Sequence, residues 1–309
     1  MINELRKAVD CILIGYGGSH AYGTSTPSSD IDIRGIYMNP PDELIGIKKD
    51  SEQFIPEDGD VVIYSIKKVF PLLLQCNPNV IEMLGLRDED YLYLDDMGRQ
   101  LLQNKEIFLS QNAVNTFGNY AKSQLNRLMN RSGRATLSTG SNEVRSLQKS
   151  ISHLKEKEGL TNIEAEEVDG KPVVYINEKM DMDVFGRVSA ELNNVHADYR
   201  KSVRNDKAIA HSKIAKHMMH LLRLYMMGID ILADHKIVTY RTAEHDLLMD
   251  VRNGKYLAED GVTPTAEFEK ILEEYHGRFN KAAAETTLPK EPDYEAANQL
   301  MMQLVRKRI

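Results

Sequence analysis

One short stretch, GYGGSHAYGTSTPSSDIDIRG at residues 15–35, constrains the fold of this chain more than any other. It follows an apolar run, continues through a Gly-Gly-Ser turn and small or polar residues, and ends with Asp30 and Asp32 among apolar neighbours. Residues i and i+2 of a strand point to the same face. Two carboxylates held that close repel each other unless a positive charge lies between them, and a divalent metal ion supplies such a charge.

The residue pattern around this stretch predicts a small mixed sheet with helices in the first ninety residues. Alternating or continuous apolar residues indicate strands at CILIGYG (11–17), SDIDIRGIYMN (29–39) and DGDVVIYSI (58–66). Helices are expected at INELRKAV (2–9), at KKVFPLLLQ (67–75) and from Asn77, with Pro78 in its first turn. The fold class is therefore α+β.

Beyond about residue 97, helical periodicity dominates, with apolar residues three and four positions apart. We therefore expect a core at residues 1–97 followed by a helical domain at 98–309. The stretch 132–180 interrupts the helical pattern. Its RSGRATLSTGS segment (131–141) is predicted to be a loop, and EEVDGKPVVYINEK (166–179) a hairpin turning at Asp169-Gly170.

Composition excludes several classes of protein. A chain with 42% hydrophobic and 28% charged residues has an ordinary soluble core, and a net charge of −7 disfavours a large nonspecific nucleic-acid surface, although a local basic groove stays possible. Two cysteines cannot form a disulfide framework or a cysteine-based zinc motif, and both are expected to be buried. The first residues are not a signal peptide, and the most apolar run (218–233) contains charges and is too short for a bilayer. We expect a cytoplasmic protein without a membrane partner; the oligomeric state is not indicated.

Phosphate chemistry needs the residue types that this stretch combines. Gly17, Gly18 and Ser19 allow backbone N–H groups to approach phosphates closely, and Asp30 and Asp32 offer the oxygen ligands that magnesium prefers. Taken singly, a Gly-Gly pair is usually only a turn, and an Asp beside Ser is usually a cap. Their combination favours nucleotidyl transfer.

This spacing resembles the signature of the DNA polymerase beta-type nucleotidyltransferase superfamily. More narrowly, GGSHAYGTSTPSSDIDIRGIY is similar to predicted bacterial and phage nucleotidyltransferases grouped with RNA-repair-associated, polymerase beta-like proteins. NPNVIEML, YAKSQLNRL, KHMMHLLRLYMMGIDIL and YRTAEHDLLMDVRNGKY resemble later blocks of that group. The resemblance therefore covers most of the chain, with 132–180 its weakest part.

The resemblance implies a nucleotidyltransferase core followed by a helical domain that closes the cleft. It further implies an NTP substrate, an attacking hydroxyl on an acceptor, and two Mg²⁺ ions, with Mn²⁺ as a substitute. The superfamily usually has a third carboxylate on a later strand. Asp60, which leads DVVIY, is the first candidate; Asp58 is the alternative, although it lies within an Asp-Gly turn.

The acceptor is where the sequence leaves alternatives open. The resemblance favours RNA, such as a tRNA or a broken 3′ end. A protein or a small molecule such as an antibiotic would use the same core, as would a toxin or antiviral effector. A different class is a regulatory module that binds NTP without turnover, which the retained pair Asp30 and Asp32 argues against.

A polar stripe on an otherwise apolar helix supplies further candidates. Lys216, His220 and Arg223 stand at i, i+4 and i+7 and share one face. Either this face binds the triphosphate or the acceptor, or its cations form structural ion pairs. His20 follows the turn directly and is a nucleotide-binding candidate; Tyr22 and Thr24 carry the same ambiguity between nucleotide contact and local bonding.

Other cations and histidines have more ordinary explanations. Lys122 and Arg127 fit a solvated helix face, with acceptor binding as the alternative. The last block offers either helix-end charges or phosphate contacts at Arg241, Arg252 and Lys255. His217 and His220 are spaced to share zinc but have no cysteine or carboxylate at ligand spacing, so a zinc site is not expected.

Overall fold

The computed structural model describes residues 1–56, 60–135, 139–168, 171–206, 210–261 and 263–309. Contacts divide the chain into two compact units. The first contains residues 1–125, 219–252 and 267–309, and the second contains residues 126–218 and 253–266. Segments from both predicted domains therefore share the first unit.

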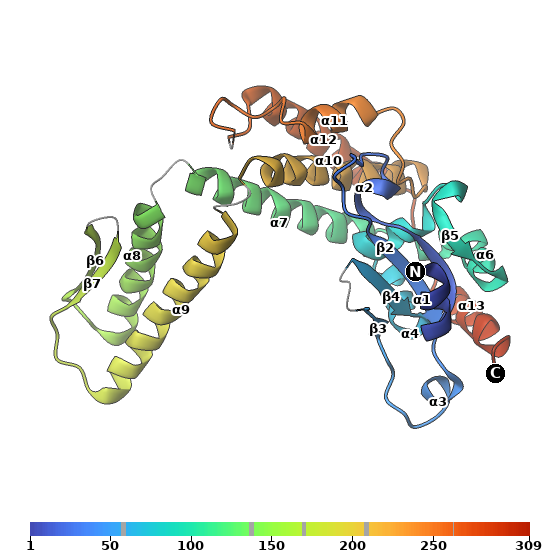
Figure 1. Ribbon diagram of the computed structural model, residues 1–309, viewed down its shortest axis with the longest axis horizontal. Coiled ribbons are helices and arrows are strands. Elements are labelled where there is room, and N and C mark those ends of the chain that lie inside the picture. The colour runs from blue at the N-terminus through green and yellow to red at the C-terminus, as the bar shows by residue number, and fades with distance from the viewer. Residues whose placement is uncertain (57–59, 136–138, 169–170, 207–209, 262) are drawn as a thin grey trace. The chain divides into compact units, whose positions relative to one another are not determined.

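The first unit contains a five-stranded mixed sheet (Figure 1). Its strand order is β3-β4-β2-β1-β5. The strands are β1 Asp10–Tyr16, β2 Ile33–Met38, β3 Gln53–Phe54, β4 Val61–Ser65 and β5 Tyr91–Leu94. β1 is antiparallel to both of its neighbours, β2 and β5, whereas β2 runs parallel to β4. The predicted α+β class is confirmed.

One boundary of this sheet differs from the prediction. β2 begins at Ile33, so Asp30 and Asp32 lie in the segment that leads into the strand and not within it. Aspartate is depleted in strands, and the preceding Thr-Pro-Ser-Ser is turn-forming, so the ladder starts only where the apolar run becomes continuous.

Short helices cover and connect these strands. Within the first unit they are α1 Ile2–Ala8, α2 Gly18–Ala21, α3 Pro41–Leu44, α4 Ile66–Leu74, α5 Pro78–Ile81, η1 Glu82–Leu84, η2 Asp88–Asp90, α6 Asp96–Gln103, η3 Lys105–Phe108, α11 His245–Arg252 and α13 Tyr294–Arg306. Three longer helices contain residues of both units: α7 Asn112–Ala135, α10 Ala210–Asp234 and α12 Ala266–Glu285. No helix within the described ranges has the length and apolar character needed to span a membrane.

Local sequence signals explain where the helices near the sheet begin. The Ser65 hydroxyl accepts the Lys68 N–H at 3.2 Å and caps α4, and the Asn77 side chain accepts the Asn79 N–H at 3.1 Å at the start of α5. Both helices are as predicted. Helices α1, α4 and α6 pack against the sheet, and Ile12, Leu13 and Ile14 of β1 are fully buried. Both cysteines are buried thiols, as expected.

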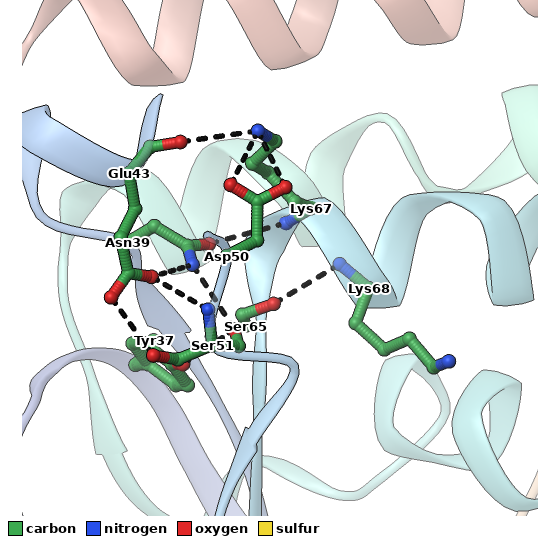
Figure 2. A network of polar contacts seen from close by, with 8 residues as sticks. All are labelled: Tyr37, Asn39, Glu43, Asp50, Ser51, Ser65, Lys67 and Lys68. Carbon is green, nitrogen blue, oxygen red and sulfur yellow. Dashed lines mark hydrogen bonds and ion pairs between the residues drawn. The ribbon is translucent and has the colours of Figure 1, made fainter. Parts of the chain in front are cut away.

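A polar network joins the end of β2 to the loop after α3 (Figure 2). Glu43, 4% exposed, accepts hydrogen bonds from the Asn39 amide at 2.9 Å and from the Ser51 N–H and hydroxyl at 2.8 Å. Lys67 of α4 lies 2.7 Å from Asp50 and donates to the Glu43 carbonyl at 3.1 Å. We name Asn39, Glu43, Asp50, Ser51 and Lys67 the Glu43 network.

The second unit is a helical pair with a hairpin. It contains α8 Thr139–Glu158, α9 Met182–Asp206 and the antiparallel strands β6 Ile163–Val168 and β7 Lys171–Ile176. Helix α8 packs against α9 and against both strands. The buried residues of this core are Val144, Leu147, Ile151, Leu154, Leu160, Ile163, Ala165 and Val188.

The hairpin prediction is confirmed, because Val168 pairs with Lys171 across the expected turn; residues 169–170 themselves lie outside the described residues. The predicted loop at 131–141 is wrong for most of its length. α7 continues to Ala135, and α8 begins at Thr139. Serine, threonine and glycine lower helix propensity by less than about 1 kcal/mol each, which helix packing and propagation can override.

Candidate functional site

The glycine turn follows β1 directly and folds back against the segment that carries the aspartates. The Gly17 N–H donates to the Asp32 carbonyl at 2.8 Å. Gly18 has φ +54°, in the left-handed region that glycine adopts readily. A Cβ at Gly18 would collide with the Asp32 carboxylate, so the turn and the carboxylate are in direct contact. The structure therefore brings together Gly17, Gly18 and Asp32 of the predicted site residues.

Sheet register brings Asp60 beside Asp32. Ile33 pairs with Val61 in the parallel ladder, and the Ile33 N–H donates to the Asp60 carbonyl at 2.9 Å. Because paired residues of parallel neighbours share a face, the positions one residue earlier, Asp32 and Asp60, are neighbours too. Asp30 and Asp60 are exposed, whereas Asp32 is half-buried. The alternative, Asp58, lies outside the described residues.

The positive charge beside Asp32 is Arg34 of β2. Its guanidinium lies 3.5 Å from the Asp32 carboxylate and donates to the Ile33 carbonyl at 3.0 Å. Across the part of the chain that the structure describes, no three His, Cys, Asp or Glu side chains form a metal-holding group by themselves. Magnesium is commonly bound by one or two carboxylates together with substrate phosphates and water. The Asp32 carboxylate and that of its register neighbour Asp60 are oxygen donors that suit this chemistry.

Thr24 and His20 differ in whether their polar groups are hydrogen-bonded within the turn. Thr24 is buried, and its N–H donates to the Ser19 carbonyl at 2.9 Å, so it closes the turn locally. The His20 ring stacks on Tyr16 with centroids 5.5 Å apart. His20 Nε2 is buried and has no hydrogen-bond partner among the described residues. His20 therefore contributes a buried ring nitrogen whose hydrogen-bonding capacity no described residue satisfies.

The three polar residues of the α10 stripe, Lys216, His220 and Arg223, have different surroundings. Lys216 is exposed and belongs to the second unit. His220, in the first unit, meets the Tyr120 ring edge-on at 5.6 Å between centroids. Arg223, also in the first unit, is 7% exposed, and its guanidinium lies 3.2 Å from the centroid of the Tyr22 ring. The sequence therefore identified Arg223 as unusual, but the ring beneath it was not foreseen.

Glu82 is the site residue that sequence reasoning missed. The Tyr22 hydroxyl donates to its carboxylate at 2.8 Å. Burial raises the pKa of Glu82, while Arg223, the Tyr22 hydrogen bond and Arg34 lower it, and the charge of Asp32 raises it again. The available signal was a single acid inside the apolar run NVIEML. Glu82 links the turn electrostatically to Arg223.

Arg252 also lies at the segment that precedes the aspartates. Its guanidinium donates to the Ser29 hydroxyl at 2.8 Å and to the Thr26 hydroxyl at 3.5 Å. Burial lowers the pKa of Arg252, and the charge of Arg223 lowers it further. Arg252 lies in the last turn of α11, as the helix-end interpretation expects, and its hydrogen bonds reach the segment between the glycine turn and Asp30; phosphate contact stays a prediction.

The other predicted cations have different surroundings. Arg241 is 3% exposed and lies 2.6 Å from the half-buried Asp230 carboxylate, so its charge is paired within the fold. Lys255 lies 5.5 Å from the centroid of the Tyr256 ring in the second unit. Lys122 is exposed on α7; Arg127 is on the same helix, and its side chain lies outside the described residues.

The glycine turn, the carboxylates beside it and the mixed sheet are together typical of a polymerase beta-like protein. The family described as the RNA repair pathway DNA polymerase beta family, RlaP, matches residues 3–303, and the chain belongs to that family. Membership covers the glycine turn, the aspartates and the arginines of α10 and α11, and it suggests a nucleotidyltransferase.

Among curated proteins, an uncharacterized 38.9 kDa protein of Enterobacteria phage T4, from the nrdC-mobD intergenic region, is 30% identical over 128 residues. The match covers 38% of this chain and 38% of the phage protein, so the alignment spans well under half of that relative. No solved structure matches the chain.

Proposed function

We propose that the protein is a metal-dependent nucleotidyltransferase that moves an NMP from an NTP to an acceptor hydroxyl and releases pyrophosphate. The observation that carries the proposal is the contact between Gly18 and the Asp32 carboxylate, which leaves no space for a side chain at the turn. A turn of this kind holds phosphates through backbone N–H groups, and here its carboxylate neighbour is already in place.

The residues of this chain have distinct tasks in the proposed reaction. The backbone of Gly17, Gly18 and Ser19 binds the phosphates, and Asp30 and Asp32, with Asp60, would hold two Mg²⁺ ions, or Mn²⁺ in their place. When bound, such ions neutralise phosphate charge and lower the pKa of the attacking hydroxyl. Asp60 would orient the acceptor hydroxyl and accept its proton; its register position beside Asp32 and its exposure support this role.

The transfer step balances without a further reactant. The acceptor oxygen forms a bond to the α-phosphorus, the bond from that phosphorus to the bridging oxygen breaks, and pyrophosphate leaves with the electron pair. Positioning and charge stabilisation supply most of the rate in phosphoryl chemistry. His20, His220 and Arg223 of the first unit complete the proposed nucleotide-binding set, and Lys216 of the second unit stays a separate candidate.

RNA is the proposed acceptor because the family to which the chain belongs is described by RNA repair. A tRNA or a 3′ end offers the hydroxyl that the reaction needs. Nucleotidylation of a protein or small molecule, and NTP binding without turnover, are the alternatives that the experiment separates.

Following the label from each α-labelled NTP in turn, with Mg²⁺ and total RNA, tests the proposal. Label is expected in RNA, and Asp32→Asn is expected to lower its incorporation by about 10³-fold, because a carboxylate at the metal site is lost. Asp246→Asn is the matched control, since that side chain is fully exposed. Label in protein or in a small molecule would replace RNA as the acceptor. Absence of transfer to any acceptor, despite NTP binding, would contradict the proposed activity.

A further inference from the structure

The charges of segment 126–218, the main part of the second unit, are unevenly distributed along the sequence. Residues 126–135, 139–149, 198–206 and 210–218 contain ten lysines and arginines but three acidic residues. Residues 150–168 and 171–197, which lie between them in the sequence, contain five lysines and arginines and nine acidic residues. A strongly basic part therefore exists within a chain whose net charge is −7.

The fold brings the four basic segments to one end of the second unit. Arg187, near the start of α9, donates to Glu158 at the end of α8 at 3.0 and 2.7 Å, so these two packed helices are antiparallel (Figure 1). Thr139 precedes Glu158 by as many residues as Asp206 follows Arg187, so α8 starts level with the end of α9. Four residues of chain, which span at most about 14 Å, separate α7 from α8 and α9 from α10. We name these four helix ends the basic end.

The cations of the basic end recur at helical spacing. They are Arg127, Arg131 and Arg134 of α7, Arg145 and Lys149 of α8, Arg200, Lys201 and Arg204 of α9, and Lys213 and Lys216 of α10. Each of the four helices therefore contributes at least one pair three or four residues apart, and residues at that spacing share a helix face.

On α8 and α10, these cations stand opposite to the buried face of the helix. The buried residues are Val144, Leu147, Ile151 and Leu154 of α8, and Ile214, Ala215 and Met218 of α10. At about 100° per residue, positions 145 and 149 lie on the other side of α8, and positions 213 and 216 on the other side of α10. Lys149 and Lys216 are exposed. Core packing in the second unit therefore does not use the basic side of these helices.

Local effects do not account for all of these charges. Cations near the C-terminal ends of α7 and α9 are favoured by the helix dipoles, which is an ordinary explanation for them. The cations near the N-terminal ends of α8 and α10 have no such support, because that end of a helix favours anions. Like charges collected at one end repel one another, and the three acidic residues there are too few to neutralise ten cations. A polyanionic partner would remove this repulsion.

We propose that the basic end of the second unit binds the phosphate backbone of the RNA acceptor. The assignment rests on the proposed function for its partner, and it extends that function by naming the surface that holds the acceptor. Phosphates of a polynucleotide are spaced along a strand, which suits cations distributed over four helix ends; a nucleoside triphosphate is one compact anion. Phosphate contacts carry no sequence information, so binding at this surface should depend little on RNA sequence.

Binding of the full chain to a labelled single-stranded RNA of about twenty nucleotides, measured by fluorescence anisotropy at several salt concentrations, tests the surface. The basic-end variant replaces four arginines by glutamine: Arg131, Arg134, Arg200 and Arg204. It is expected to raise the Kd by about tenfold or more and to lower the slope of log affinity against log salt by about 3, because four phosphate contacts are lost. In the transfer assay, the KM for RNA should rise while kcat and the KM for NTP stay unchanged.

A matched control removes the same number of charges from the rest of segment 126–218. It replaces four lysines by glutamine: Lys155, Lys157, Lys171 and Lys179. Its RNA affinity should stay within about twofold of wild type, because these charges lie among acidic residues and away from the basic end. Thermal melting identifies a variant that fails to fold. In that case the exposed Lys149 decides, through Lys149→Gln against Lys157→Gln, with an expected loss of about threefold in RNA affinity for Lys149→Gln alone.

Several results would overturn the proposed surface. They are wild-type protein that does not bind RNA, a basic-end variant with unchanged affinity and salt slope, and equal losses in the basic-end variant and the lysine control. Binding of polyglutamate but not of RNA would also overturn it, in favour of an acidic protein partner. RNA binding with the expected losses but without nucleotidyl transfer would overturn the proposed function only. Transfer to RNA with an unchanged KM for RNA in the basic-end variant would overturn the surface and leave the proposed function in place.

Discussion

Two polar clusters of the first unit flank the same strand, β2, and they differ in how completely their groups are paired. In the Glu43 network, both carboxylate oxygens of Glu43 accept hydrogen bonds and Lys67 meets Asp50 (Figure 2). At the glycine turn, His20 and Arg223 have buried nitrogen atoms without partners among the described residues. Buried polar groups are normally satisfied. We therefore expect a structural role for the complete cluster, and we expect a ligand at the glycine turn, where Gly18 and the Asp32 carboxylate are in contact.

If the glycine-turn cluster is the reactive one, the largest loss of nucleotidyl transfer in this set is expected on replacing its third carboxylate. Asp60→Asn is expected to lower nucleotidyl transfer by about 10²- to 10³-fold, because it removes a charge beside Asp32. Asp58→Asn is expected to change the rate less than about threefold, as for a turn residue. Single-turnover rates at saturating NTP measure both. The reverse ranking would transfer the role to Asp58.

A somewhat smaller effect is expected at the turn. Gly18→Ala places a methyl group against the Asp32 carboxylate at φ +54°, so either the turn or the carboxylate must move. We expect a loss of transfer of about 10²-fold and a destabilisation of about 1–2 kcal/mol. Transfer assays and denaturant unfolding measure the two effects separately. Near wild-type turnover would show that the contact between Gly18 and Asp32 is not needed.

A substitution in the Glu43 network should lower stability without affecting ligand binding. Glu43→Ala leaves the Ser51 N–H unpaired and removes one of the two hydrogen bonds that the Asn39 amide donates, so we expect a loss of about 2–3 kcal/mol in the free energy of unfolding. Pyrophosphate affinity of the folded variant should stay unchanged, because no residue of the network belongs to the site. Urea unfolding and calorimetry test the pair of statements. A selective loss of ligand affinity would break the distinction between the two clusters.

The smallest expected effect is a dependence of stability on pH. Hydrogen bonds from the Ser51 backbone and the Asn39 side chain lower the pKa of Glu43 from 4.5 to about 2. The unfolded chain therefore takes up this proton first, so the stabilisation is complete above about pH 4.5 and is lost as the pH falls towards 2. Glu43→Gln should show a shallower decline in unfolding free energy between pH 4.5 and 2. Equal slopes in the two proteins would contradict the assignment.

How far the sequence predicts this molecule depends on the range of the interactions involved. The strands, the caps at Ser65 and Asn77 and the hairpin in the second unit follow from local patterns. The glycine turn and Asp32 were identified because a known family combines them at a fixed spacing. The placement of α8 was missed, because its stability comes from packing against α9 and the hairpin.

The partners of Arg223 were not predictable from the sequence. Tyr22 and Arg223 are separated by about two hundred residues, and nothing in the residues between them reports that a ring will lie under the guanidinium. Glu82 has an environment that depends on the same contact, so its raised pKa could not be inferred either. Long-range contacts between single side chains are thus the part of the site that only the structure supplies.

The discontinuity of the first unit has a consequence for synthesis on the ribosome. The turn and all three aspartates emerge within the first sixty residues, whereas Arg223 and Arg252 emerge after the whole of segment 126–218 of the second unit. A nascent chain therefore has the acidic half of the site long before its basic half. Any product truncated before residue 223 would carry every proposed metal ligand and neither arginine. Such fragments are expected to be inert, so a message broken before the codon for residue 223 is not expected to yield a partly active enzyme.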